Sequence, residues 1–386
     1  MANIDSMDFF KFNFSENLNH GLEIMGFKKA TPVQKEAIPL IQKNKDIIAC
    51  AQTGTGKTAA FVLPILDKQT KIKRANKVNT IIIAPTRELA KQIDRQIEGF
   101  SYFVNSTSYP IYGGGDGIEF DKQKKALING TDIIICTPGR LMAHLDFNYF
   151  DTSGIEHFIL DEADRMLDMG FYDDIISIAK KLPKKCQTLM FSATMPVKIR
   201  KLANKLLKNP VNINIAISKP ASKIKQTAYY CKNNEKVNIV KNIIKQKGRN
   251  STNILIFCSS IKSVKEINKM LTKHRINSSE MHSGLNQKER EETIRNFENK
   301  KNRILITTDI LSRGIDIKDI ELVINYEVPK DVEDYIHRIG RTARANKNGE
   351  AITLVHSEQM KYFKKIENFI NKKIPVLKFI KKIQEI

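Results

Sequence analysis

Residues 46–60 have the sequence DIIACAQTGTGKTAA, which combines an apolar run with a glycine-bearing turn. The apolar run at 47–50 is short enough to be a buried strand. It is followed by Gly54 and Gly56, then by Lys57 and Thr58, where an alanine-rich helix begins. A strand, a glycine-bearing turn and a helix with Lys-Thr at its start are typical of a phosphate-binding loop. An ordinary strand-to-helix turn with a surface lysine is the alternative.

Each residue type in this stretch suits a nucleoside triphosphate. Glycines let backbone N–H groups close around phosphate oxygens, and the positive end of a helix faces the anion. Lys57 is expected to reach the β- and γ-phosphates, and the Thr58 hydroxyl to coordinate Mg²⁺. Ala51 stands where the GxxxxGK[ST] pattern has its first glycine, and the other fixed positions fit. The predicted nucleotide-binding residues of this loop are Gln52, Thr53, Gly54, Thr55, Gly56, Lys57 and Thr58.

Composition is typical of a globular protein, and the excess of positive charge favours a polyanionic partner. Its 386 residues predict two or three domains, and no apolar run is long enough to cross a membrane. The N-terminus resembles no secretory signal, and five scattered cysteines without a CxxC pair indicate reduced thiols and a cytoplasmic location. The formal net charge of +22 favours nucleic acid as partner. An AT-rich genome, which enriches Lys, Asn and Ile, would produce the same excess.

The apolar runs alternate with helical patterns, which predicts doubly wound parallel sheets. In the first half the runs lie at 47–50, 80–84, 132–136, 157–160 and 188–191. In the second half they lie at 254–257, 304–306, 322–324 and 351–355. The pattern weakens near 209–225, so we predict domains at 1–212 and 225–386 with a linker at 213–224. Residues 360–386 are expected to form a terminal helix and further packing on the second domain.

Two adjacent carboxylates, Asp161 and Glu162, end the run at 157–160. Neighbouring residues at a strand end point to opposite sides, so a facing acid/base pair is not expected. One carboxylate can hold Mg²⁺ while the next orients the attacking water in phosphoryl transfer. A helix N-terminus enriched in acidic residues is the alternative, and the nearby phosphate loop favours the functional interpretation.

Together these motifs make the chain resemble a DEAD-box RNA helicase of bacterial type, with residues 161–164 as the DEAD tetrad. The resemblance covers about residues 27–344 and implies two tandem RecA-like domains joined by a short linker. It implies that Phe27 stacks on the adenine of ATP and that Gln34 hydrogen-bonds its edge. His144 and His157 have no partners at metal-ligand spacing. These histidines are therefore not expected to form a metal cluster. The resemblance implies ATP and Mg²⁺ as cofactors, and it implies that Thr58 and Asp161 hold the metal.

The resemblance also assigns roles to residues in both domains. Implied RNA contacts are Pro85, Thr86, Arg87, Gly114, Thr137, Gly139 and Arg140 in the first domain, and Gln287, Arg290, Thr308, Asp309 and Arg313 in the second. Ser192, Thr194 and His337 are implied to couple hydrolysis to strand separation. Gly314 and Asp316 are implied to approach the nucleotide. Phe257 resembles an aromatic residue of another family motif, and core packing at a strand end is its alternative.

Arg341 and Arg344 resemble the family's arginine fingers, with Ala343 where glycine is usual. A guanidinium is a planar, permanently charged fork for phosphoryl oxygens. We therefore expect Lys57, Glu162, Arg341 and Arg344 to be the catalytic residues. A basic surface helix is the alternative for the two arginines.

Three functions fit these motifs. The first is an ATP-dependent helicase that binds the backbone of single-stranded RNA, without sequence preference, and unwinds short duplexes as an inter-domain cleft closes. The second is an ATP-gated RNA clamp or RNP-remodelling factor with little net unwinding. The third, a motor acting on DNA, is disfavoured by the DEAD tetrad and by the pair Phe27 and Gln34. A monomer is expected, and the sequence names no protein partner.

Overall fold

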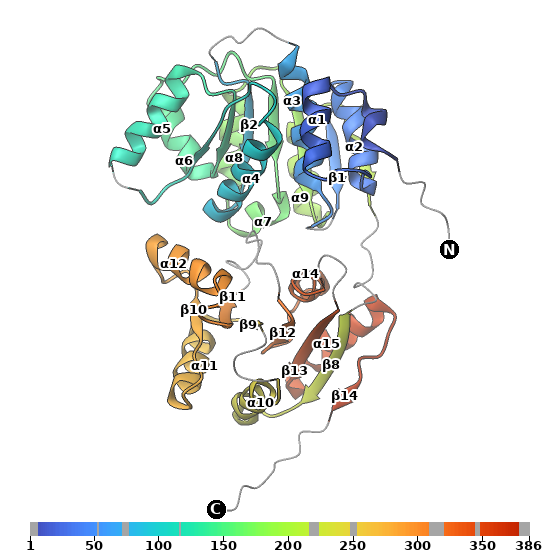
Figure 1. Cartoon of the computed structure of the whole chain (residues 1–386), viewed down its shortest axis with the longest axis vertical. Helices are drawn as coiled ribbons and strands as arrows, with labels where there is room; N and C mark the ends of the chain where they lie inside the picture. Colours follow the sequence, from blue (N-terminus) through green and yellow to red (C-terminus); the bar gives the residue numbers. More distant parts are fainter. Residues whose placement is uncertain are drawn as a thin grey trace, which may run out of the picture. The chain divides into compact units, whose positions relative to one another are not determined.

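The computed structural model describes residues 7–51, 54–71, 77–115, 117–215, 224–247, 253–308, 320–343 and 348–377. The chain divides into two compact units, Met1–Ile217 and Ser218–Ile386, coloured blue to green and yellow to red in Figure 1. Within the described residues each unit contains one seven-stranded sheet flanked by helices, which confirms the predicted fold class. Across these ranges no helix is both long and apolar enough to span a membrane.

The sheet of the N-terminal unit consists of short, mostly buried strands. Ile82 in its middle pairs with Ile135 on one side and with Ile159 on the other. Every strand pair is parallel, so the carboxyl ends of the strands lie along one edge. In spatial order the strands are β3 (Ser108–Ile111), β4 (Ile133–Cys136), β2 (Thr80–Ile83), β5 (His157–Leu160), β6 (Gln187–Ser192), β1 (Ile47–Cys50) and β7 (Val211–Asn214).

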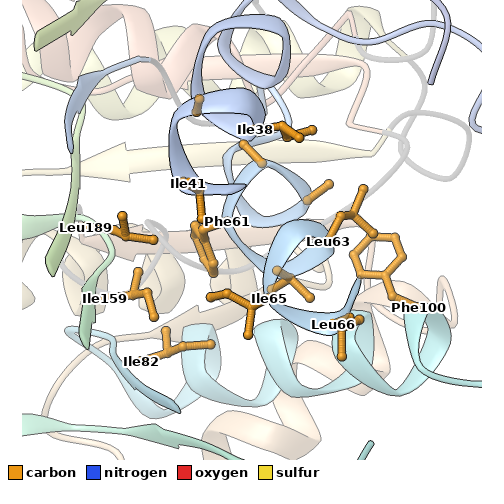
Figure 2. Close-up of a cluster of buried hydrophobic side chains, with 14 of the residues drawn as sticks. Ile38, Ile41, Phe61, Leu63, Ile65, Leu66, Ile82, Phe100, Ile159 and Leu189 are labelled. Carbon is orange, nitrogen blue, oxygen red and sulfur yellow. The ribbon is translucent and has the colours of Figure 1, made fainter. Parts of the chain in front are cut away.

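Helices cover both faces of this sheet, because successive strand residues point to opposite sides. Ile47 and Ala49 of β1 belong to one core, and Ile48 belongs to the other. Figure 2 shows the core that contains Ile47 and Ala49, where Phe61 of α3 (Lys57–Thr70) lies beside Leu189 of β6. The helices are η1 (Phe9–Phe12), α1 (Glu16–Ile24), α2 (Pro32–Gln42), α3 (Lys57–Thr70), α4 (Arg87–Phe100), α5 (Gly117–Asn129), α6 (Pro138–Asp146), α7 (Ala163–Asp168), α8 (Tyr172–Lys180) and α9 (Val197–Leu206).

The C-terminal unit repeats this plan with a second parallel sheet. Its spatial order is β10 (Ser279–Met281), β11 (Ile304–Thr308), β9 (Ile254–Cys258), β12 (Leu322–Asn325), β13 (Gly349–Val355), β8 (Ile224–Tyr230) and β14 (Val376–Leu377). Its helices are α10 (Asn233–Gln246), α11 (Ile261–Lys273), α12 (Gln287–Glu298), α14 (Val332–Ile339), η2 (Ser357–Gln359) and α15 (Met360–Ile370). Ile256 of β9 lies in one core cluster and Leu255 in another, so both faces are buried here too.

The predicted strands of both halves are present, and the strands that lacked a clear pattern lie toward the sheet edges. β3 contains Pro110, which edge strands tolerate because one of their sides needs no ladder partner. Three of the four residues of β7 are exposed, so β7 has no continuous apolar run. The predicted linker at 213–224 overlaps β7 at its start and β8 at its end, and residues 216–223 lie outside the described ranges.

Candidate nucleotide and RNA sites

The carboxyl edge of the N-terminal sheet separates the predicted site residues into two groups. The phosphate loop, the Asp161–Glu162 pair and Ser192 follow or end the adjacent strands β1, β5 and β6. The segments with the predicted RNA contacts follow the other adjacent strands, β3, β4 and β2. Ligands of open parallel sheets bind at this edge. The fold therefore places the segments predicted to bind nucleotide beside those predicted to contact RNA, and we call these two parts of the edge the nucleotide half and the RNA half.

The phosphate loop has the backbone geometry of an anion cradle. Gly54 and Gly56 have φ of 81° and 86°, a left-handed conformation that glycine adopts without strain. A Cβ atom on Gly56 would lie only 2.4 Å from Gln34 Nε2, so a larger residue there would displace the Gln34 amide. Gln52 and Thr53 lie outside the described residues.

Lys57 is the first residue of α3 and is only 6% exposed. Its Nζ is shielded from solvent and has no hydrogen-bond partner among the described residues. A buried ammonium without hydrogen bonds is unfavourable, and a bound anion would relieve this state. Phosphate oxygens at the start of α3 would meet this need, as they would be at the positive end of the helix dipole.

Gln34 connects the predicted adenine-reading segment to the phosphate loop. Its Oε1 accepts a hydrogen bond from the Thr31 backbone N–H at 2.8 Å, closing a capping box at the start of α2. Its Nε2 donates to the Gly56 carbonyl at 3.0 Å. An amide has two donor hydrogens and two acceptor lone pairs, so one of each remains for a base edge. The partly exposed ring of Phe27 makes edge contacts with the rings of Phe9 and Phe100.

Asp161 and Glu162 form a tight turn between β5 and α7. Asp161 is 3% exposed, and its Oδ1 accepts the Glu162 backbone N–H at 3.0 Å. Burial raises the pKa of Asp161 to about 6, although the charge of Lys57 opposes this shift. Glu162 has φ 53° and ψ 51°, a left-handed conformation that costs an L-residue about 1–2 kcal/mol. Such strain is characteristic of functional sites, and here it sets the turn from which the Glu162 side chain projects.

The Glu162 carboxylate is also held by its own helix, since Arg165 Nη1 lies 3.4 Å from Glu162 Oε2. Both side chains are buried. The pair fixes the carboxylate next to Asp161 and keeps the group that would orient a water molecule from turning away.

Asp164 is a site residue that the sequence analysis did not assign. Its carboxylate Oδ2 accepts hydrogen bonds from the Thr194 backbone N–H at 3.0 Å and from the Thr194 hydroxyl at 2.9 Å. The Ser192 hydroxyl accepts the Asp164 backbone N–H at 3.3 Å and donates to the Thr194 carbonyl at 2.7 Å. The last residue of the DEAD tetrad is therefore bonded to the segment predicted to couple hydrolysis to strand separation. The position of Asp164 within the tetrad is the sequence feature that could have identified it as a site residue.

In the RNA half, Arg87 and Gly114 are packed together. Gly114 has φ of 87°, and a Cβ atom there would lie 2.0 Å from Arg87 Nη1. Glycine thus lets the guanidinium lie directly against the backbone that follows β3. Thr86 begins α4, and its hydroxyl accepts the Leu89 backbone N–H at 3.3 Å. Pro85 and Thr86 are buried, so they would meet RNA through few atoms.

Arg140 lies in the first turn of α6, close to Thr137 and to the exposed Gly139. Burial lowers the pKa of the Arg140 guanidinium, and the charge of Arg87 acts in the same direction. The two guanidinium groups are thus near enough to interact. Two positive charges beside exposed glycine backbone suit consecutive phosphates of one strand.

In the C-terminal unit, several predicted residues are positioned but others are not described. Gln287 and Arg290 lie in the first turns of α12, and Arg290 Nη2 donates to the Ser283 carbonyl at 2.9 Å. Thr308 ends β11, His337 lies on α14, and Arg341 follows α14 and is buried. The predicted residues Asp309, Arg313, Gly314, Asp316 and Arg344 lie outside the described ranges.

Phe257 is a core residue, which resolves the alternative that its position left open. Its ring is 1% exposed and packs with Leu255 and Val323. The Arg338 guanidinium lies 5.3 Å from the ring centroid and donates from Nη1 to the Glu327 carbonyl at 3.0 Å.

Ala343 is expected to be a strained residue beside the predicted arginine fingers. Its φ is 58°, where an L-residue is disfavoured and glycine is not. Ala343→Gly should raise the free energy of unfolding of the C-terminal unit by up to about 1 kcal/mol in urea denaturation. Ala351→Gly, in the middle of β13, serves as the opposite control and should destabilise. Equal destabilisation by both substitutions would contradict the assignment.

Comparison with known proteins extends these observations. Residues 31–202 match the family model described as DEAD/DEAH box helicase, and residues 235–346 match the helicase conserved C-terminal domain. The chain is 37% identical to ATP-dependent RNA helicase CshA of Listeria monocytogenes, over 96% of this chain and 70% of the relative. It is also 37% identical to DEAD-box ATP-dependent RNA helicase RhpA of Helicobacter pylori, over 90% of this chain and 70% of the relative.

A solved structure of S. cerevisiae Dbp5 bound to RNA and ADP BeF3 is similar to this one, with a TM-score of 0.85 and 30% identity. The similarity covers 96% of this chain and 95% of that one. The two family matches lie in the two units, and the relatives are matched over nearly the whole chain. The chain therefore belongs to the family of DEAD-box ATP-dependent RNA helicases.

Proposed function

We propose that this chain binds the backbone of single-stranded RNA and separates short RNA duplexes locally, in a cycle coupled to ATP hydrolysis. The observation that carries the proposal is the division of the carboxyl edge into a nucleotide half and an RNA half on adjacent strands. The relatives described as RNA helicases, and the neighbour solved with RNA and ADP BeF3, support the same assignment.

The nucleotide half would bind ATP through its phosphates and its base. Lys57 and the backbone of Gly54–Gly56 would hold the phosphates, and Phe27 with Gln34 would hold the adenine. Thr58 and Asp161 supply a hydroxyl and a carboxylate, oxygen ligands of the kind Mg²⁺ prefers. A bound Mg²⁺ would neutralise charge that develops on the phosphoryl oxygens. Burial raises the pKa of Asp161 to about 6, and a bound cation would favour its ionised form.

Binding of Mg–ATP should therefore depend on pH through Asp161. Its ionised form is the ligand, so the apparent affinity should fall as pH drops below 6, by about tenfold per pH unit at the limit. The measurement is a titration with fluorescent ATP between pH 7.5 and pH 5, on the wild type and on Asp161→Asn. Protonation of ATP affects both proteins, so the difference between the curves isolates Asp161. Parallel curves would contradict the assignment.

Glu162 would orient the attacking water. Asp164 would couple movement of the nucleotide site to movement of Thr194. The paired hydrogen bonds from Thr194 to Asp164 link the end of β5 to the segment after β6. A shift of the tetrad on loss of the γ-phosphate would thus move the segment that follows β6.

The C-terminal unit would supply Arg341 and Arg344 to the phosphates, with Gly314 and Asp316 nearby and His337 in a coupling role. RNA held by Arg87, Arg140, Gln287 and Arg290, among others, would favour closure of the two units around ATP. ATP and RNA should then bind with positive coupling. Contacts to phosphates predict weak sequence preference and strong dependence on salt.

The direct test is steady-state ATPase with and without single-stranded RNA, beside unwinding of a blunt RNA duplex. We expect RNA to stimulate the ATPase and ATP to drive unwinding, with single-stranded DNA inactive. If RNA left the ATPase rate unchanged in a preparation whose active fraction had been verified by nucleotide binding, the proposal would be refuted. Stimulation without unwinding would indicate an RNA clamp, and stimulation by DNA a DNA motor.

We further propose that the protein is a cytoplasmic monomer.

A further inference from the structure

Gln123 lies on the buried face of α5, and its side-chain amide is hydrogen-bonded through both its oxygen and its nitrogen. It is 0% exposed and lies one helical turn from the buried Leu127. Its Oε1 accepts hydrogen bonds from Arg140 Nε at 2.7 Å and from His144 Nε2 at 3.0 Å. Its Nε2 donates to the Tyr112 carbonyl at 3.0 Å. A buried amide is tolerated only when it is bonded in this way.

Arg140 determines which way the Gln123 amide points, because the Arg140 Nε–H can only donate and therefore faces the amide oxygen. The Gln123 oxygen can only accept, so a neutral His144 carries its proton on Nε2. Its Nδ1 then accepts from the Tyr149 hydroxyl, which is its other partner. Burial lowers the pKa of His144 to about 4, with the charge of Arg140 acting in the same direction, so the ring is neutral near pH 7. The amide oxygen is therefore held toward α6, where it meets Arg140.

Arg140 is held on one side and unsatisfied on the other. Its Nε is bonded to Gln123, and its guanidinium carbon lies 4.4 Å from the centroid of the Phe120 ring. That ring stacks on His144 with centroids 4.4 Å apart. Arg140 Nη2 is shielded from solvent and has no hydrogen-bond partner within the described ranges. A charged donor left without an acceptor is unfavourable, and an anionic oxygen would satisfy it.

The same amide reaches the glycine turn that follows β3. Its acceptor, the Tyr112 carbonyl, immediately precedes Gly113 and Gly114, and Gly114 packs against Arg87. One side chain thus connects the segments after β3 and β4, and through Gly114 it reaches the segment after β2. These are the three strands of the RNA half.

We propose that Gln123 is a positioning residue, which holds Arg140 and the glycine turn in one preformed clamp for the RNA backbone. The inference rests on the proposed RNA-binding function and adds a residue that would not touch RNA itself. Pre-organisation of this kind lowers the conformational entropy lost on binding. A structural role alone, joining α5 to α6, is the competing explanation.

The test compares Gln123→Met, Arg140→Ala and the double variant in the full-length chain. Methionine keeps the length of the side chain and removes its hydrogen bonds. We expect Gln123→Met to raise the KM for single-stranded RNA in the ATPase assay by about tenfold, as loss of one charge-assisted contact would. The kcat at saturating RNA should stay within about twofold. In the Arg140→Ala background the same substitution should have a smaller effect, about threefold or less, since only the glycine turn then depends on Gln123.

Salt dependence separates positioning from simple destabilisation. Loss of one phosphate contact reduces the slope of log Kd against log salt by about 0.7 for a single strand. We expect Gln123→Met to show most of this reduction, although it removes no charge. Leu127→Ala is the matched control, because it weakens the packing of α5 without touching Arg140. It should lower Tm and leave both the RNA KM and the salt slope unchanged.

The wild-type chain offers a check that does not depend on a variant folding. The Arg140 Nε–H proton, assigned in NMR spectra by its loss in Arg140→Lys, should exchange with water at least about tenfold more slowly than that of an exposed arginine. Exchange at the exposed rate would overturn the inference, and so would an RNA KM and salt slope in Gln123→Met equal to those of wild type. A wild-type ATPase that ignores RNA would overturn the proposed function as well, so the two failures are distinguishable.

Discussion

Replacing Glu162 with glutamine is expected to lower ATP turnover by about 10²–10⁴-fold while ATP and RNA binding are retained. Glutamine has the same shape, but its amide is a much weaker proton acceptor and orients the attacking water poorly. The buried position beside Arg165 makes the effect specific, because the side chain has little room to find another arrangement. Turnover would be measured at saturating ATP and RNA, and both affinities by equilibrium titration.

Glu156 provides the matched control for this substitution. It immediately precedes β5, at the opposite end of the strand that Glu162 follows, and it pairs with Lys68 on the surface. Glu156→Gln therefore removes one carboxylate from the same unit without approaching the site. We expect it to leave turnover unchanged. Undiminished turnover in Glu162→Gln would remove Glu162 from its proposed role.

Arg344→Ala is the second substitution with a large expected effect. A guanidinium delivered to the transferred phosphoryl group from another domain contributes about 10³–10⁵-fold to turnover. We expect a loss within this range, with ATP affinity in the absence of RNA close to that of wild type. The reason is that the N-terminal unit contains the whole phosphate loop, and Arg344 would act only when both ATP and RNA are bound.

The control for Arg344→Ala is Arg275→Ala, which removes the same charge from the same unit. Arg275 is exposed and lies in the turn from α11 into the amino end of β10. The amino ends of the strands lie at the edge of the sheet opposite their carboxyl ends, and the predicted site residues lie at the carboxyl ends. We expect near-normal turnover from the control. If both substitutions lowered turnover equally, net charge rather than a finger would explain the effect.

Local sequence predicted the features of the molecule that depend on local geometry. The phosphate loop was predictable because glycines, Lys57 and Thr58 each have a required place within a few residues of β1. The position of the carboxylate pair was predictable because Asp161 directly follows a short apolar run. Central strands were also predictable, since burial on both faces demands unbroken apolar runs.

Features that arise from tertiary contacts could not be predicted in this way. The bond from Gln34 to Gly56 joins residues 22 positions apart, and that from Thr194 to Asp164 joins residues 30 apart. Gln123 has no local pattern at all, because its partners come from the turn after β3 and from α6. An isolated glutamine on an amphipathic helix gives no sign of being buried until α5 and α6 are packed together.

We propose that a nucleotide is held by Lys57 from one unit and by Arg341 and Arg344 from the other during hydrolysis. The most direct measurement is a structure of the full chain with single-stranded RNA and a non-hydrolysable ATP analogue. We expect Lys57 Nζ and both guanidinium groups to lie within hydrogen-bond distance of the terminal phosphate. A complex in which RNA and analogue are bound, yet both arginines lie far from that phosphate, would contradict it.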